Sequence, residues 1–149
     1  MTEPQRPILI VEDNANDAYL IRTALHRAGV TAPLRIVGDP VDAVLYLQGE
    51  GRFADPASHP RPQLMLLDAG IEGGAGLDLL RWTRQRSPAR GMPIVVLMEP
   101  APDRDALIAY DLGANSCIAR PLTPDTLGQL VRAVAFCRGL DAEATPAAE

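Results

Sequence analysis

The chain reads Ile8-Leu9-Ile10-Val11-Glu12-Asp13 near its start, which is four apolar residues followed directly by two acids. The stretch Leu64-Met65-Leu66-Leu67-Asp68 repeats this pattern with one acid, and a third apolar run covers Ile94–Met98. Short uninterrupted apolar runs indicate strands that are buried on both faces of a parallel sheet. Weaker runs at Leu34–Val37 and at residues 117–119 predict two further strands near the edges of that sheet.

Helical patterns, in which apolar residues recur every three or four positions, lie between these runs. In chain order their apolar positions are Leu20, Ile21, Ala24, Leu25 and Ala28; Val41, Val44, Leu45 and Leu47; Leu77, Leu79, Leu80 and Thr83; Leu107, Ile108 and Leu112; and Leu127, Leu130, Val131 and Val134. Gly29 and Gly113 are predicted to end the first and fourth helices, and Thr123 to cap the fifth. Five strands alternating with five helices predict an α/β domain, a doubly wound parallel sheet with helices on both faces.

Length and composition indicate one globular domain. The chain has 149 residues, of which 47% are hydrophobic, and this is enough for one full core. We expect the domain to span residues 1–140. Residues 49–62 have no periodic pattern and predict a long surface loop, and the Ala-, Glu- and Pro-rich residues 141–149 predict a flexible tail.

Charge and hydropathy exclude several classes of protein. The formal net charge is -5 and the isoelectric point is about 5.0, which argues against a dedicated nucleic-acid binder. No apolar run approaches the roughly 20 residues of a membrane span, and the N-terminus lacks the basic and apolar regions of a signal peptide. We therefore expect a cytoplasmic protein that binds neither nucleic acid nor membrane. All 14 basic residues are arginine, and the chain contains no lysine.

Acidic residues follow two of the predicted strands directly. Ligands of open α/β sheets gather outside the carboxyl ends of the strands, so Glu12, Asp13 and Asp68 are expected to converge if their strands are neighbours. Carboxylates held so close repel one another unless a cation lies among them, and Mg²⁺ is the natural occupant. A carboxylate beside Mg²⁺ can attack a phosphoryl group and form an aspartyl phosphate. The alternative is that each acid only caps the following helix, a role that Asn14 or Asn16 can fill instead.

The sequence resembles the receiver domain of response regulators in two-component signalling. The matching stretches are 8–14, 64–68, 93–97, 112–116 and Arg120-Pro121-Leu122-Thr123, where the family has Lys-Pro, and the match covers residues 7 to 138 in consistent order. The resemblance implies a flavodoxin-like fold with strand order 2-1-3-4-5. The loop at 49–62 and residues 110–115 also resemble a narrower group, the stand-alone regulators paired with bacterial and cyanobacterial phytochromes.

The resemblance also implies roles for particular residues. Asp68 would be the phosphoacceptor, Glu12 and Asp13 would hold Mg²⁺, and the carbonyl of Gly70 would supply a further metal ligand. The bond before Pro121 would be cis. A sensor histidine kinase, in the narrower group a bacteriophytochrome, would donate the phosphoryl group, and the face formed by the fourth helix, fifth strand and fifth helix could form a homodimer.

Three positions depart from the family pattern. Met98 stands where the family has Thr or Ser, and a thioether cannot donate a hydrogen bond to phosphate. Cys117 stands where the fifth strand usually carries Tyr or Phe, and Arg120 replaces the lysine that pairs with phosphate. Arginine keeps the charge, but its planar fork differs from a compact ammonium.

Two hypotheses therefore stand beside each other. The first is a working receiver that is phosphorylated on Asp68 and is not itself an enzyme. The second is a degenerate receiver of the same fold, whose partner contacts do not depend on phosphate. A phosphatase is disfavoured because Gly70 stands where a second acid is needed, and a flavodoxin because residues 12–14 do not form a phosphate-binding loop.

Overall fold

Strands and helices alternate along the computed structural model, which describes residues 5–71, 74–99 and 103–138. In order they are β1 (Ile8–Val11), α1 (Ala15–Arg27), β2 (Leu34–Val37), α2 (Pro40–Gln48), the short 3-10 helix η1 (Gly51–Phe53), β3 (Leu64–Asp68), α3 (Ala75–Gln85), β4 (Ile94–Met98), α4 (Asp103–Asp111), β5 (Ser116–Ala119) and α5 (Pro124–Arg138). The strands pair in parallel in the order β2-β1-β3-β4-β5. This confirms the predicted α/β class, the five-stranded sheet and its strand order.

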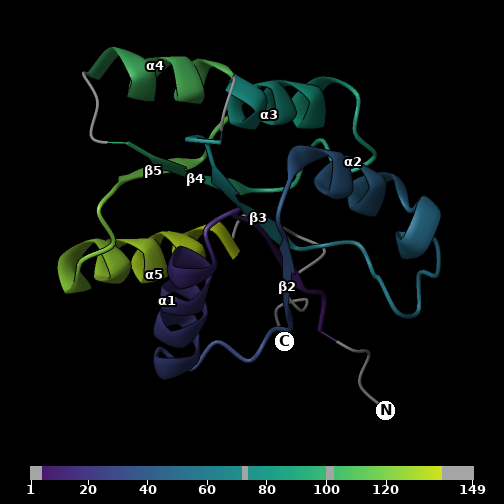
Figure 1. Cartoon of the computed structure of the whole chain (residues 1–149), viewed down its shortest axis with the longest axis horizontal. Helices are drawn as coiled ribbons and strands as arrows, with labels where there is room; N and C mark the ends of the chain where they lie inside the picture. Colours follow the sequence, from purple (N-terminus) through teal and green to yellow (C-terminus); the bar gives the residue numbers. More distant parts are fainter. Residues whose placement is uncertain (1–4, 72–73, 100–102, 139–149) are drawn as a thin grey trace, which may run out of the picture.

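The helices cover both faces of the sheet, as Figure 1 shows. Helices α1 and α5 lie on one face, and α2, α3 and α4 lie on the other. The three central strands are buried along their whole length, which explains their uninterrupted apolar sequences. Alternate strand residues point into two separate cores, one on each face, so that Leu9 and Leu67 lie in one and Ile10 and Leu66 in the other.

Some helix faces differ from the prediction. Leu20, Val41 and Leu107 were expected to face the core, but they are 38%, 68% and 63% exposed, and Ile108 is 38% exposed. The buried positions of α1, α2 and α4 include small residues instead, namely Ala18, Ala43 and Ala109. An alanine lets a helix approach a sheet closely, so the helix turns its small side toward the strands and leaves larger apolar side chains in solvent.

The segment before β3 is more structured than predicted. It contains η1, whose Phe53 is buried and packs against Tyr46, with ring centroids 5.2 Å apart. His59 meets both rings edge-on, and the Tyr46 hydroxyl donates a hydrogen bond to the carbonyl of Pro60 at 3.0 Å. An aromatic cluster therefore anchors residues 49–62 to α2, which a periodicity argument cannot detect.

Helix boundaries follow the capping signals of the sequence. Gly29 and Gly113 follow α1 and α4 with φ of 85° and 112°, a region that favours glycine. The Thr123 hydroxyl accepts a hydrogen bond from the Thr126 amide at 3.2 Å, as expected for the N-cap of α5. Residues 141–149, predicted to form a tail, lie outside the described residues. None of the described helices has the length and apolar character that a membrane span requires.

Candidate functional site

The acidic residues meet at the carboxyl edge of the sheet, as the sequence predicted. Strands β1 and β3 are neighbours with Val11 opposite Leu67, so Glu12 and Asp68 follow adjacent positions. Oxygens of Glu12, Asp13 and Asp68 all lie within 4.8 Å of one another. Glu12 and Asp68 are buried, whereas Asp13 is exposed. The cluster therefore has two buried carboxylates and one that faces solvent.

Local hydrogen bonds hold two of these carboxylates in place. The Asn14 amide donates to Oε2 of Glu12 at 3.3 Å, and the Gly70 amide donates to Oδ1 of Asp68 at 2.8 Å. The cap of α1 comes from Asn14, whose Oδ1 accepts a hydrogen bond from the Asp17 amide at 3.0 Å. Because Asn14 caps the helix, Glu12 and Asp13 are not needed for capping, and the capping alternative for this pair does not hold.

Close packing behind Asp68 depends on a glycine that the sequence analysis did not single out. A Cβ on Gly76, in the first turn of α3, would lie 2.7 Å from the Asp68 carbonyl oxygen and 2.7 Å from Cα of Ala69. Both neighbours are backbone atoms and cannot turn aside. Gly76 thus lets α3 pack directly on the end of β3, and no sequence pattern distinguishes it from the other glycines.

Arg120 lies among the carboxylates. Its Nη2 is 2.5 Å from Oε1 of Glu12 and 3.1 Å from Oδ2 of Asp68. Its Nη1 pairs with Oδ2 of Asp17, and its Nε is 3.8 Å from Oε1 of Glu99. Neither Asp17 nor Glu99 was anticipated, because their contacts depend on how far the Arg120 side chain reaches across the site.

The electrostatics of the site follow from burial and from these neighbours. Burial by itself would lower the pKa of Arg120, but Glu12, Asp68 and Asp17 outweigh it and raise that pKa above its ordinary value. Burial, followed by a hydrogen bond with Asp68, raises the pKa of Glu12 to about 8 despite the opposing effect of Arg120. One guanidinium therefore does not fully compensate the acidic cluster.

The donor set suits a hard divalent cation. Three carboxylates lie close together, one of them exposed, and oxygen ligands of this kind are those that Mg²⁺ prefers. The raised pKa of Glu12 means that its ionised form is disfavoured without a further positive charge, and a bound cation would favour that form, which adds a physical reason for a cation at this place. The backbone at Gly70 passes close by, since a Cβ there would lie 3.2 Å from Oδ1 of Asp68. The role of the Gly70 carbonyl as a ligand remains a prediction.

The three atypical positions surround the same edge. Met98 is the last residue of β4 and is packed in the apolar core, while its carbonyl accepts a hydrogen bond from the Arg120 amide at 2.7 Å. Cys117 is half-buried on β5 near the side chain of Tyr110 of α4, and burial raises the pKa of its thiol. The aromatic ring beside β5 therefore comes from the neighbouring helix. The Arg120–Pro121 bond is cis, which confirms the prediction.

Comparisons with known proteins agree with this geometry. The family model of the response regulator receiver domain matches residues 8–132. Response regulator Rcp1 of Synechocystis sp. is 27% identical over 133 residues, which is 89% of this chain and 88% of Rcp1, and its Mn²⁺-bound structure has a TM-score of 0.76. The phosphorylated cyanobacterial phytochrome response regulator RcpA is 30% identical with a TM-score of 0.78, covering 97% of this chain and 99% of RcpA. The bacteriophytochrome response regulator RtBRR is 31% identical with a TM-score of 0.75, covering 88% and 76% of the two chains.

Proposed function

This chain belongs to the response regulator receiver domain family, and we propose that it is a single-domain response regulator that accepts a phosphoryl group on Asp68 from a sensor histidine kinase. The observation that carries the proposal is the position of Asp68 at the end of β3, with oxygens of Glu12 and Asp13 within 4.8 Å. A family of signalling modules is not a family of enzymes in the ordinary sense. Any catalysis here concerns the domain's own phosphorylation and dephosphorylation.

The reaction is an in-line displacement at phosphorus. A carboxylate oxygen of Asp68 forms the new O–P bond as the bond from phosphorus to the donor breaks. The Gly70 amide orients the attacking carboxylate through its 2.8 Å hydrogen bond. Arg120, 3.1 Å from the same carboxylate, supplies positive charge to the phosphoryl oxygens. Mg²⁺ held by Glu12, Asp13, Asp68 and the Gly70 carbonyl would neutralise further charge.

The response to phosphorylation is proposed to be unconventional. Met98 offers no hydroxyl to a phosphoryl oxygen, and Cys117 offers no ring to turn. Of these three positions, Arg120 is the one whose side chain can bind the new group. Tyr110 of α4 lies near Cys117 and is the aromatic side chain that we propose responds to phosphorylation in place of a ring on β5.

Partners follow from the relatives and from the exposed surface. The names of RcpA, a cyanobacterial phytochrome response regulator, and RtBRR, a bacteriophytochrome response regulator, support a bacteriophytochrome as the kinase. A cytoplasmic location is part of the same proposal. Helix α4 exposes Leu107, Ile108 and Tyr110, an apolar surface that supports a homodimer through α4, β5 and α5.

A degenerate receiver is the second candidate function. It is favoured by Met98 and Cys117 at the two positions that usually read the phosphate, and by an Arg120 that already pairs with Asp68. In this case the fold would present the same partner surface whether or not Asp68 carries phosphate.

Intact-mass spectrometry after exposure to acetyl phosphate and Mg²⁺ separates the two candidates. We expect wild type to gain the mass of one phosphoryl group, and expect neither Asp68→Asn nor wild type with a chelator to gain it. Asp42→Asn removes an aspartate of α2 that pairs with Arg52 and is not part of the acidic cluster; it is the matched control and should be labelled like wild type. An unlabelled wild type, under conditions that label an ordinary receiver, favours the degenerate receiver.

A further inference from the structure

The Arg120 guanidinium contacts carboxylates at two depths of the site. Its Nη2 touches the inner ones, Glu12 at 2.5 Å and Asp68 at 3.1 Å, whose side chains are 0% and 6% exposed. Its Nη1 pairs with Asp17, whose side chain is 25% exposed. Among the described residues, Asp17 belongs to no group of carboxylates close enough to share a metal. One side chain therefore joins the acidic cluster to the first turn of α1.

The inner contacts use the same oxygens that a divalent cation needs. A cation bound by Glu12 and Asp68 takes up lone pairs of those carboxylates, and the guanidinium already engages Oε1 of Glu12 and Oδ2 of Asp68. Two positive charges cannot occupy adjacent positions without repulsion. Arg120 and a divalent cation must therefore compete for the cluster.

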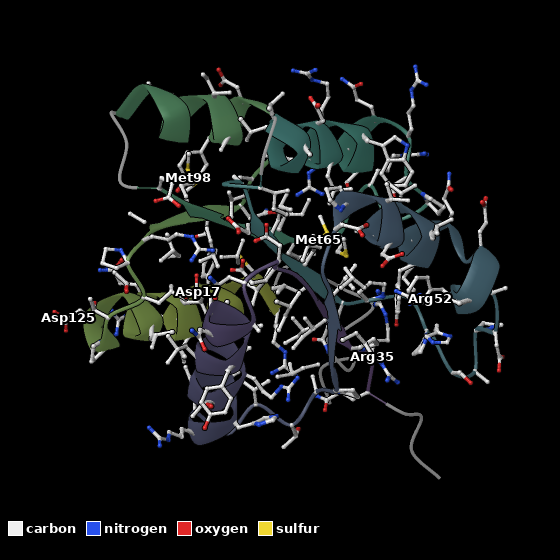
Figure 2. The ribbon with its side chains drawn as sticks, in the orientation of Figure 1. Asp17, Arg35, Arg52, Met65, Met98 and Asp125 are labelled. Atoms are coloured by element: carbon white, nitrogen blue, oxygen red, sulfur yellow. The ribbon has the colours of Figure 1, made fainter. Side chains whose placement is uncertain are left out.

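Asp17 holds the Arg120 guanidinium against Glu12 and Asp68, where it competes with a divalent cation. Its backbone amide is bound by Oδ1 of Asn14 at 3.0 Å, so its carboxylate is carried on a well-fixed helix turn. The planar fork of arginine can bind Asp17 with one nitrogen and the inner carboxylates with another, which a lysine ammonium does less well. Figure 2 shows Asp17 at the start of α1 and Met98 at the end of β4, toward the same end of the sheet.

Space for a displaced guanidinium lies next to the site. A hollow of about 300 Å³ is lined by Asp17, Glu99, Arg120, Pro121 and Leu122. Glu99 is 68% exposed, and its Oε1 lies 3.8 Å from Nε of Arg120 on this outer side. Arg120 can therefore leave the inner carboxylates while it stays near two outer ones.

We propose that Asp17 is a positioning residue that holds Arg120 on Glu12 and Asp68 as a built-in counter-ion, and thereby weakens divalent-cation binding at the acidic cluster. The inference deepens the proposed function because it concerns the same site, but it depends only on cation binding. It also links the cation to α1 through a single side chain, since a bound cation would weaken the contacts of Arg120 with Glu12 and Asp68 while its contact with Asp17 remains.

The affinity of the protein for Mn²⁺ alone tests this proposal. Binding is monitored as the loss of the free-ion signal in electron paramagnetic resonance. Wild type, Asp17→Asn, Arg120→Gln and the double variant are titrated at one pH. We expect Arg120→Gln to bind Mn²⁺ about tenfold more tightly, because its competitor is gone. Asp17→Asn should bind about threefold more tightly, as fits the loss of one partly exposed ion pair.

The double variant carries the decisive comparison. Once Arg120 is glutamine, Asp17→Asn should give no further gain, since Asp17 acts through Arg120. Asp42→Asn is the matched control, because it also removes an aspartate that pairs with an arginine, Arg52 at 2.7 Å, and should bind like wild type. Circular dichroism confirms folding of each variant. If Arg120→Gln fails to fold, Arg120→Lys replaces it. A lysine binds Asp17 and the inner carboxylates together less well than arginine, so its Mn²⁺ affinity should fall between wild type and the expected tenfold gain.

Several results would overturn the inference. An equal effect of Asp17→Asn in both backgrounds would mean that Asp17 acts through its own charge. Unchanged or weaker Mn²⁺ binding in the Arg120 variants, or no binding by any variant, would remove the competition. A protein that shows the expected Mn²⁺ pattern but takes up no phosphoryl group would leave this inference intact and contradict the proposed function, so the two failures are distinguishable.

Discussion

Replacing Arg120 by glutamine, in protein free of divalent cations, should destabilise the fold strongly. The side chain is 11% exposed and pairs with Glu12 and Asp68, which are 0% and 6% exposed. Removing one partner of a buried ion pair leaves an uncompensated charge and costs about 3–5 kcal/mol. Because Glu12 can take up a proton, we expect the lower end of this range, about 3 kcal/mol near neutral pH.

The assays are equilibrium urea unfolding, which gives the free energy of unfolding, and thermal unfolding, both monitored by circular dichroism. For a domain of this size, 3 kcal/mol corresponds to a fall in melting temperature of roughly 6–12 °C. The deficit should grow above the raised pKa of Glu12, about 8, where Glu12 loses its proton. It should shrink in Arg120→Gln combined with Glu12→Gln, because the uncompensated charge is then smaller.

An exposed ion pair provides the control. Arg52 pairs with Asp42 at 2.7 Å, but its side chain is 65% exposed, so Arg52→Gln should cost less than about 1 kcal/mol. An Arg120→Gln protein that is no less stable than the Arg52→Gln protein would contradict the role of Arg120 as the counter-ion of Glu12 and Asp68. Such a result would mean that solvent, and not Arg120, compensates the acidic cluster.

Three further predictions concern Glu12, Gly76 and Phe53. Because the pKa of Glu12 is raised, the folded chain holds a proton between about pH 4.5 and 8 that the unfolded chain releases. The free energy of unfolding of the cation-free protein should therefore fall across this window as pH rises. In urea titrations, Glu12→Gln should flatten this fall. Gly76→Ala should push α3 away from Asp68 and cost about 1–3 kcal/mol, with slower labelling by acetyl phosphate; an unaltered labelling rate would contradict the packing argument. Phe53→Ala should cost about 3 kcal/mol by thermal unfolding, whereas a loss below 1 kcal/mol would mean that the loop is not anchored by its aromatic cluster.

The sheet could be predicted from sequence because its central strands are buried on both faces. Runs such as Ile8–Val11 contain no polar residue. The chain between successive apolar runs is long enough for one helix. Helix faces were less predictable. Leu107 is more apolar than Ala109, yet Ala109 faces the sheet, since close approach favours the smaller side chain.

Tertiary contacts between distant residues explain what the sequence could not reveal. Glu12, Asp13 and Asp68 could be predicted together because strand ends in a parallel sheet share one edge. Asp17 could not, because its partner Arg120 lies 103 residues further along the chain and reaches it only in the folded protein. The buried cluster around Phe53 is of the same kind, as it depends on His59 folding back over the ring.

The identity of the phosphorylated residue is the most direct test of the account. Borohydride reduces an aspartyl phosphate to homoserine, and peptide mass spectrometry then locates the reduced residue. After labelling with acetyl phosphate and Mg²⁺, we expect homoserine at position 68 and at no other aspartate. Homoserine at Asp13 or Asp17, or at no position in a protein that is folded and binds Mn²⁺, would contradict the claim that Asp68 is the phosphoryl acceptor.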